Sequence, residues 1–548
     1  MECSMECGNR FENLFLELVA KHVLAWLELR PRKRLRAASR RLCDRLRPYV
    51  FGKEYAYRPL YLASREEYGC CRAGFGPNIA ISLCHVPSPT ELPWLLEAGA
   101  DIMLTMRGTR SPDELTRCLL TCEGSLVELN IIHEPYTDPL DHPFRVALGR
   151  LARLEVLNLS GYTLISTDLL KGLRLKKLDL AGCGLTCTTA LRDLPSSLTA
   201  LNVSTNYLHP DSISRLAGLT QLTKLNVSNA KLAGQNPLES LAGLARLVQL
   251  TELDVSDCSV QDFGDILSGR LPALERLNAA GNAINSVVHI ACGLKELDLT
   301  RSRTRLTLTG QLSTLTKLRL GCSSVFVGQA LLDPSMEALA SAHVMEVLEI
   351  SSMSMGEPEI LEALMRGKRR LSQLVLKSVW GDGNIAVMTR MLPSLARLTW
   401  LNLDSTSLGV AFVNALDAHG QPMAALTTLI LSSQCVSIDG DIFALVRALQ
   451  LMPALKALNM RGALRRADSV RMVLKCAPES LTEIDLAYNS FYPIHKGQAA
   501  ARIELELCMV ELRRFADLTS VAILDPYNTN LSLVAGVSGP PTIVETVN

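Results

Sequence analysis

The sequence predicts an α/β repeat solenoid, in which short parallel strands form one curved face and turns or helices form the other. Three observations predict it. An L-x-x-L-x-L frame recurs along most of the 548 residues, an Asn or Cys follows several copies, and successive copies begin 20 to 30 residues apart. Such regular self-similarity indicates units that bury their apolar faces against their neighbours.

Each frame is expected to contribute one short strand. The period of two at its centre is that of a strand with one buried face, and the earlier leucine fills the core beside it. The chain carries fourteen copies of this frame, which begin at Leu154, Leu175, Leu198, Leu222, Leu250, Leu274, Leu294, Leu315, Met345, Leu371, Leu398, Leu426, Leu455 and Leu481.

Several frames place a small polar residue three positions after the last strand leucine. This pattern resembles that of leucine-rich-repeat proteins, in which a buried polar side chain satisfies backbone groups where the chain turns away from the strand. The resemblance covers most of the chain and implies a horseshoe like that of ribonuclease inhibitor. It assigns the buried polar position to Asn206, Asn282, Asn489, Cys183 and Cys258.

The spacing between frames predicts what lies on the outer side. Frames begin 20 to 28 residues apart up to Leu315 and mostly 26 to 30 apart from there to Leu481. We therefore expect irregular or 3₁₀ connections in the first part and helices in the second. Helical spacing of apolar residues is visible at 356–367, 384–392, 411–420 and 440–452.

Weaker frames precede the regular ones, and the frame fades after Leu481. The expected organisation is a helical module at 1–50, a linker at 51–77, a solenoid at 78–525 and a tail at 526–548. Within the solenoid we expect degenerate opening repeats at 78–150, regular repeats at 154–490 and a C-terminal cap at 491–525.

Composition narrows the function. Apolar residues make up 48% and charged residues 20%, which favours a folded core, while 56 basic and 55 acidic side chains nearly cancel. No net field therefore favours nucleic acid or anionic lipid. Sixteen cysteines without a regular framework, and an N-terminus unlike a signal peptide, predict reduced thiols and a cytoplasmic, possibly nuclear, location. No apolar run is long enough to predict a membrane span.

The first fifty residues differ from the repeats. Residues 14–27 are apolar over more of a helix than one face, so another surface must cover them. This segment resembles an F-box, the module that binds the Skp-type adaptor of cullin-RING ubiquitin ligases, although Phe15 and Leu42 stand where the family usually has proline and tryptophan. The resemblance implies an adaptor-binding set of Leu14, Glu17, Leu18, Val23, Leu24, Leu27 and Leu35.

A different reading of these helices stays open. Every solenoid needs a cap over its first repeat, and residues 1–50 would also serve as that cap. Residues 33–36 match a basic nuclear-import signal, although a basic exposed helix face explains the same residues.

The partner surface is predicted from residues that lie between the frame leucines. These point away from the core, and most of them are polar. Val375, Trp400 and Ile430 are large and apolar instead, and we expect neighbouring repeats to bring them together, with Arg319 and Glu349 toward one rim of the patch as polar selectors. The alternative is that a C-terminal segment folds over the patch. The predicted set is Arg319, Glu349, Val375, Trp400, Asn402 and Ile430.

No motif indicates catalysis, a cofactor or a metal. The nearest grouping is Cys70, Cys71, Cys84 and His85, whose spacing matches no known structural zinc site. The F-box resemblance implies that the protein is a substrate-recognition subunit of a ubiquitin ligase. Such a subunit works by proximity: it holds one protein while an adaptor and a cullin hold the ligase machinery. The other interpretation is a scaffold or regulatory binding protein that is unrelated to ubiquitin.

Overall fold

The computed structural model describes residues 102–132, 142–230, 241–322, 339–489 and 507–522, with internal gaps of at most eight residues. It also describes four short strands at 60–61, 81–83, 531–534 and 542–545. The chain divides into two compact units, Met1–Gln235 (unit 1) and Asn236–Asn548 (unit 2).

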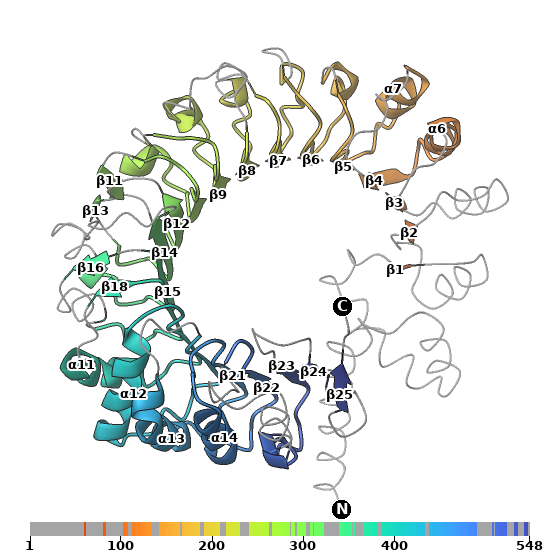
Figure 1. Cartoon of the computed structure of the whole chain (residues 1–548). Helices are drawn as coiled ribbons and strands as arrows, with labels where there is room; N and C mark the ends of the chain where they lie inside the picture. The colour runs from red at the N-terminus through yellow and green to blue at the C-terminus, as the bar shows by residue number, and fades with distance from the viewer. Residues whose placement is uncertain are drawn as a thin grey trace, which may run out of the picture. The chain divides into compact units, whose positions relative to one another are not determined.

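Unit 1 is a stack of parallel strands (Figure 1). Each described strand pairs with the next, and the frame leucines lie in register, as Leu157 does with Leu178 and Leu178 with Leu201. The strands are β1 (Leu60–Tyr61), β2 (Ile81–Leu83), β3 (Ile102–Arg107), β4 (Leu126–Ile132), β5 (Val156–Asn158), β6 (Lys177–Asp179), β7 (Ala200–Asn202) and β8 (Lys224–Asn226).

Unit 2 has the same parallel pattern, in which each strand of the main sheet again pairs with its neighbour. Its strands are β9 (Glu252–Asp254), β10 (Arg276–Asn278), β12 (Glu296–Ser302), β14 (Lys317–Cys322), β15 (Val347–Ser351), β17 (Gln373–Lys377), β19 (Trp400–Asn402), β20 (Thr428–Ile430), β21 (Ala457–Asn459), β22 (Glu483–Asp485) and β23 (Ser520–Ala522). The parallel strands of each unit are those of a leucine-rich-repeat solenoid, as the frames predict.

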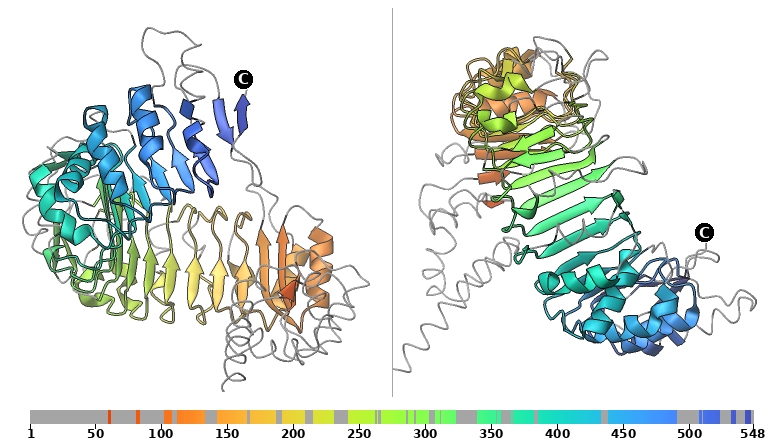
Figure 2. Two further views of the ribbon diagram at one scale, coloured as in Figure 1. Left: turned by 90° about the horizontal axis from the view of Figure 1, so that it is seen from below. Right: turned by 90° about the vertical axis from the view of Figure 1, so that its left-hand side faces the viewer.

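The outer connections follow the spacing of the frames, with exceptions. Helices α11 to α14 cover the outer side of the later strands of unit 2 (Figure 2). Helices α11, α12 and α13 fall on segments for which the sequence predicts a helix. Helix α14, and helices α6 and α7 in the opening repeats, are not predicted. The helices are α6 (Pro112–Thr121), α7 (His142–Gly149), α11 (Ile385–Leu395), α12 (Leu408–His419), α13 (Ile442–Gln450) and α14 (Ala467–Cys476).

Shorter elements fill the remaining connections. Single helical turns lie at η2 (Asp168–Leu170), η3 (Ala242–Arg246), η4 (Ile266–Arg270) and η5 (Ile438–Asp441). In unit 2, two further parallel pairs lie outside the main sheet, β11 (Val287–Ile290) with β13 (Thr307–Gly310) and β16 (Ser354–Gly356) with β18 (Trp380–Gly381). Each pair brings equivalent segments of neighbouring repeats side by side.

Two elements lie in segments that the expected organisation treats as a linker and a tail. Strand β1 falls inside the expected linker at 51–77 and pairs with β2. An antiparallel pair, β24 (Leu531–Val534) with β25 (Thr542–Glu545), falls inside the expected tail. Alternating apolar residues on both sides of a Gly-Pro-Pro segment give this pair the pattern of a hairpin. β1 has only two residues, which is too short for a periodic signal.

The frame leucines form the core of each unit. Leu154, Leu157 and Leu159 of one repeat are at most 1% exposed, and the same positions are buried in the following repeats. Stacking makes these side chains one continuous apolar layer, and burying a leucine contributes about 1.5–3 kcal/mol. Among the described helices, none is long and apolar enough to cross a membrane.

The buried polar position behaves as the repeat resemblance implies. Asn282 is fully buried; its Nδ2 donates to the carbonyl oxygens of Val255 (2.9 Å) and Ala279 (2.8 Å), and its Oδ1 accepts from the backbone N–H of Val260 (2.9 Å). Asn206 and Asn489 make the same kinds of bond. The side chain thus satisfies backbone groups that the turn leaves without a strand partner.

Candidate functional site

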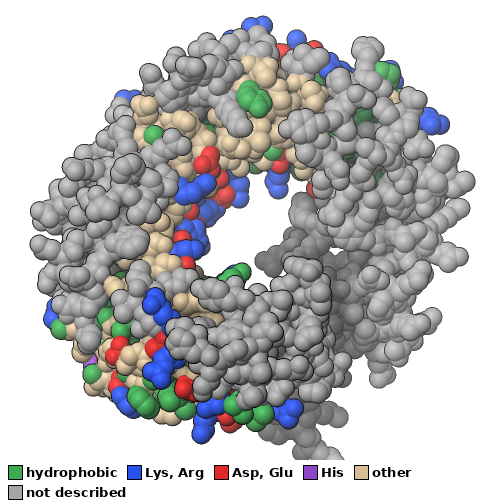
Figure 3. Space-filling model, in the orientation of Figure 1, with side chains coloured by type: hydrophobic (Ala, Val, Ile, Leu, Met, Phe, Trp, Pro, Cys, Tyr) green, Lys and Arg blue, Asp and Glu red, His purple; other side chains and the backbone are tan. Residues whose placement is uncertain are grey.

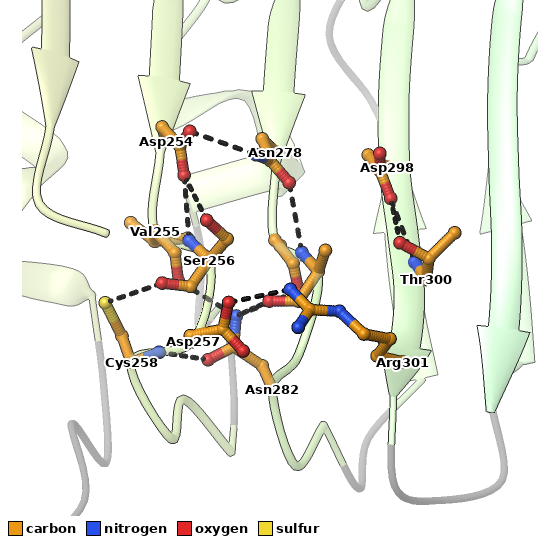
Figure 4. Close-up of polar contacts among 12 residues, drawn as sticks. Asp254, Val255, Ser256, Asp257, Cys258, Asn278, Asn282, Asp298, Thr300 and Arg301 are labelled. Carbon is orange, nitrogen blue, oxygen red and sulfur yellow. Dashed lines mark hydrogen bonds and ion pairs between the residues drawn. The ribbon is translucent and has the colours of Figure 1, made fainter. Parts of the chain in front are cut away.

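The central outward residue of most strands has a structural task. In Asp254 the Oδ1 atom accepts hydrogen bonds from the backbone N–H of Ser256 (2.9 Å) and from its hydroxyl (2.7 Å), and Asp298 does the same for Thr300 (Figure 4). This is an Asx turn, which bends the chain away from the sheet. It recurs at Asn158, Asp179, Asn202, Asn226, Asn278, Asn402, Asn459 and Asp485.

Several of these side chains also form hydrogen bonds with the equivalent residue of the neighbouring strand. Asn278 Nδ2 donates to Asp254 Oδ2 at 3.0 Å, and equivalent bonds join Asn202 to Asp179 and Asn459 to Asp485. Many of these side chains are committed to turns and to their neighbours, which the leucine frame alone does not reveal.

Strands β14, β15, β17 and β20 have no Asx turn at their central outward residue. Their central residues are Arg319, Glu349, Val375 and Ile430, none of which has the short carboxylate or amide of an Asx turn. All four belong to the predicted partner-binding set. Because the turn does not need these side chains, their chemistry is available for another purpose.

Five predicted residues lie in one row across the sheet. Arg319 is in register with Glu349, Glu349 with Val375, Val375 with Asn402, and Asn402 with Ile430. Adjacent strands are about 4.8 Å apart, so the row extends over about 19 Å. Val375, Asn402 and Ile430 are half-buried and face the open side of unit 2.

Trp400 belongs to the neighbouring row, in register with Gln373 and Thr428. Its side chain lies on the same face of β19 as Asn402, two residues along, and the residue is 39% exposed. Trp400 is thus diagonal to Val375 and Ile430 on the neighbouring strands. The sequence predicts that the three residues lie near one another but not that they occupy two rows.

Together these two rows form an uncharged surface that we call the neutral sector. It covers β17, β19, β20 and β21, and the outward side chains of its two rows carry no charge. Its residues are Gln373, Val375, Trp400, Asn402, Thr428, Ile430, Ala457 and Asn459.

Charged side chains line the sheet on the N-terminal side of the neutral sector, and Figure 3 shows both signs mixed along this inner wall. Arg319 bonds to Glu349 (Nε–Oε2 3.1 Å) and approaches Asp298 (3.6 Å). Further pairs join Arg276 to Glu252, Lys295 to Glu275 and Lys317 to Glu296. The hydrogen bond that Arg276 donates to the Glu252 carboxylate raises the pKa of Arg276. This part of the wall is therefore charged but internally paired.

The adaptor-binding set Leu14, Glu17, Leu18, Val23, Leu24, Leu27 and Leu35 lies outside the described residues. The grouping of Cys70, Cys71, Cys84 and His85 lies outside them as well. Within the described part of the chain, no group of three or more His, Cys, Asp or Glu side chains is placed to hold a metal. Cys183 is buried, and desolvation together with nearby Asp179 raises its pKa to about 12, so its thiol is protonated and unreactive.

Comparisons with known proteins give structural neighbours alone. No family model and no curated protein matches the sequence. Among solved structures, an internalin from Listeria monocytogenes is 17% identical, with 71% of this chain and 84% of the internalin covered and a TM-score of 0.35. The leucine-rich-repeat ectodomain of the Arabidopsis receptor kinase HAESA, in complex with a peptide hormone, is 18% identical over 71% of this chain and 70% of the receptor chain, with a TM-score of 0.38.

Proposed function

We propose that unit 2 binds a protein partner on its open face, with the neutral sector as the main contact and the Arg319–Glu349 pair as its charged border. The observation that carries this proposal is the row from Arg319 to Ile430, in which four side chains leave the Asx pattern that ten described strands keep. The turns after these strands form without an Asx bond, so the large apolar side chains of Val375 and Ile430 are free to serve as contact surface.

The chemistry of the sector supports a protein ligand. Trp400 is large and partly exposed, and tryptophan is enriched among residues that dominate interface energy. Uncharged side chains such as Val375 and Ile430 lose little on desolvation, whereas the charged wall beside them would have to give up hydration or existing pairs. A partner would therefore bury the neutral sector and meet Arg319 and Glu349 at its edge.

For the whole chain, the proposed role is substrate recognition in a cullin-RING ubiquitin ligase. The support is the F-box-like sequence of residues 14–40, and the open face of unit 2 would hold the protein to be modified. The chain would contribute proximity, because a tethered target meets the ligase machinery at a raised effective concentration. A scaffold without a ubiquitin connection is the competing function.

An adaptor-binding experiment separates the two functions. The intact chain and a Leu18→Ser/Leu24→Ser variant are each mixed with a purified Skp-type adaptor and run on a sizing column. Substrate recognition predicts a complex with the intact chain that the double variant fails to form. If the intact chain forms no complex, the ligase role is rejected, and the scaffold interpretation remains with the partner surface unaffected.

A further inference from the structure

Three arginines and a tyrosine lie together where strands β21 and β22 turn outward. Arg461, Arg465, Arg466 and Tyr488 are all exposed, and we call this group the rim patch. Arg461 follows the neutral-sector residue Asn459 by two positions, so the rim patch adjoins the proposed partner surface. None of its members belongs to the surface predicted from the leucine frames.

Backbone hydrogen bonds hold the two turns of the rim patch side by side. The N–H of Gly462 donates to the carbonyl oxygen of Ala487 at 2.9 Å, and the N–H of Leu464 donates to Asn489 Oδ1 at 2.8 Å. These bonds flank Tyr488 and place Arg461 over its ring, with the guanidinium carbon 4.2 Å from the ring centroid. The stacked pair presents a cation on an aromatic platform.

Tyr488 occupies a backbone conformation that favours glycine. Its φ is +61°; the equivalent position, two residues after the last buried strand residue, is glycine in three repeats (Gly182, Gly281 and Gly462) and a smaller or non-aromatic residue, such as Thr205, Asp257 or Ser405, in others. A bulky side chain held there costs about 1 kcal/mol. The residue is 46% exposed, so burial returns little of this cost. A role in contact explains the tyrosine better than a role in stability.

The carboxylates around the rim patch already have partners. Asp485 accepts bonds from the N–H of Ala487 and from Asn459, Asp439 Oδ2 accepts from the N–H of Arg465 at 2.6 Å, and Asp468 lies 3.8 Å from Arg471. Over the described residues, by contrast, the guanidinium groups of Arg461, Arg465 and Arg466 have no carboxylate partner. The patch thus has three guanidinium groups that form no ion pair with the described carboxylates.

Helix α14 adds to this positive potential. Arg466 is its N-cap, and no side chain caps the helix there. The positive end of the helix dipole therefore lies beside the arginines, although Asp468 in the first turn offsets part of it.

We infer that the rim patch binds an acidic peptide segment of the protein partner. Arginine forks pair with carboxylate groups, and Tyr488 offers a face and a hydroxyl beside them. The inference deepens the proposed protein-binding function, on which it rests. A partner seated on the neutral sector would place its acidic segment against the turns of β21 and β22.

The test measures fluorescence anisotropy of a fluorescein-labelled peptide of alternating Glu and Gly with the full-length chain. The first variant is Arg465→Glu/Arg466→Glu. The matched control is Arg369→Glu/Arg370→Glu, which reverses the same charges on two adjacent exposed arginines at another turn of unit 2. We expect the first variant to weaken binding at least tenfold, the control to change it less than twofold, and Tyr488→Gly to weaken it severalfold.

Additional peptides define the ligand chemistry. A peptide with Gln in place of Glu is expected to bind at least tenfold more weakly, and added salt is expected to weaken the Glu peptide. A phosphoserine version that binds much more tightly than the Glu version identifies phosphate as the preferred anion. Equal binding of the Glu and Gln peptides, equal loss in both arginine variants, or no binding of any peptide overturns the inference.

A further variant distinguishes this result from failure of the proposed function. Trp400→Ala is expected to leave peptide binding within twofold, because the tryptophan lies in the neutral sector and not in the rim patch. Loss of peptide binding in the arginine variant alone thus reports on the rim patch, whatever the outcome for the neutral sector.

Discussion

Arg301 Nη2 donates to Asp257 Oδ2 at 2.7 Å, although the two residues belong to repeats that are not adjacent (Figure 4). The repeat between them has Gly281 at the equivalent position, and the absence of a side chain there lets the pair form. All three residues have positive φ, +54° at Asp257, +71° at Gly281 and +56° at Arg301. A turn that recurs in successive repeats thus brings the side chains of Asp257 and Arg301 within reach of each other.

Substitution of Gly281 should therefore destabilise unit 2. A Cβ at this position would lie 2.0 Å from Asp257 Oδ1, so Gly281→Ala forces Asp257 away from Arg301 in addition to straining the backbone. The expected loss is about 1–2 kcal/mol in the free energy of unfolding, mostly from the left-handed backbone, because an exposed ion pair contributes little. Chemical denaturation measures it.

The control for this prediction is Gly420→Ala. Gly420 has a similar φ of +68°, but no atom lies within 4 Å of the added Cβ. Gly281→Ala should lose more than this control, and Asp257→Ala should remove the excess when the two substitutions are combined. An equal loss at both glycines, in both backgrounds, would mean that the clash is absorbed without cost.

The leucine frame predicts the repeating elements because each frame contains its own signal. Period-two leucines locate the strands, and the asparagine at +3 locates the buried polar ladder, as Asn206 and Asn282 confirm. The contact between Asp257 and Arg301 has no such local signal. It depends on which residues occupy the same turn position in three successive repeats, Asp257, Gly281 and Arg301.

The candidate site likewise contains residues that the sequence predicts and residues that it misses. The sequence identifies Val375, Trp400 and Ile430 because apolar residues are unusual at outward positions, but it does not separate their two rows. It misses the Asx turns and the rim patch, since Arg461 and Tyr488 are 27 residues apart in sequence and meet only through the stacking of β21 and β22.

Removal of a ladder asparagine should be costly. Asn282→Ala leaves the carbonyl oxygens of Val255 and Ala279 and the N–H of Val260 without their partner in a fully buried position. We expect a loss of about 2–4 kcal/mol in the free energy of unfolding. Asn402→Ala, at a half-buried residue with one Asx-turn bond, should lose under about 1 kcal/mol. Similar losses for both variants in chemical denaturation would contradict this account of the ladder.

Trp400→Ala should weaken the partner without unfolding the chain. The side chain is 39% exposed, so its removal leaves the core intact, whereas truncation of an interface tryptophan costs about 2 kcal/mol, or about thirtyfold in Kd. Titration calorimetry with the captured partner measures the affinity. Phe443→Ala is the matched control, because Phe443 is an exposed aromatic residue on α13, on the outer side of the same unit. Equal affinity of the Trp400 variant and the wild type would exclude Trp400 from the interface.

Lys368 should make stability rise with pH. It is fully buried at a position where other repeats have an apolar residue, three before the frame leucine, and its Nζ donates to the Leu339 carbonyl oxygen at 2.6 Å. Burial lowers its pKa from 10.5 to about 8. Between those values the unfolded chain binds more protons than the folded chain, so the free energy of unfolding increases as pH rises through this window. The full gain would be about 3 kcal/mol.

The comparison is with Lys368→Met, which keeps a long unbranched side chain but cannot titrate. At pH 7 the variant should be the more stable protein, because the wild type then buries a charged ammonium group whose only contact in the described residues is one carbonyl oxygen. In chemical denaturation from pH 7 to pH 9.5, the free energy of unfolding of the wild type should increase relative to that of the variant as the pH increases. Parallel curves for the two proteins would mean that Lys368 reaches solvent and titrates near its ordinary pKa in the folded state.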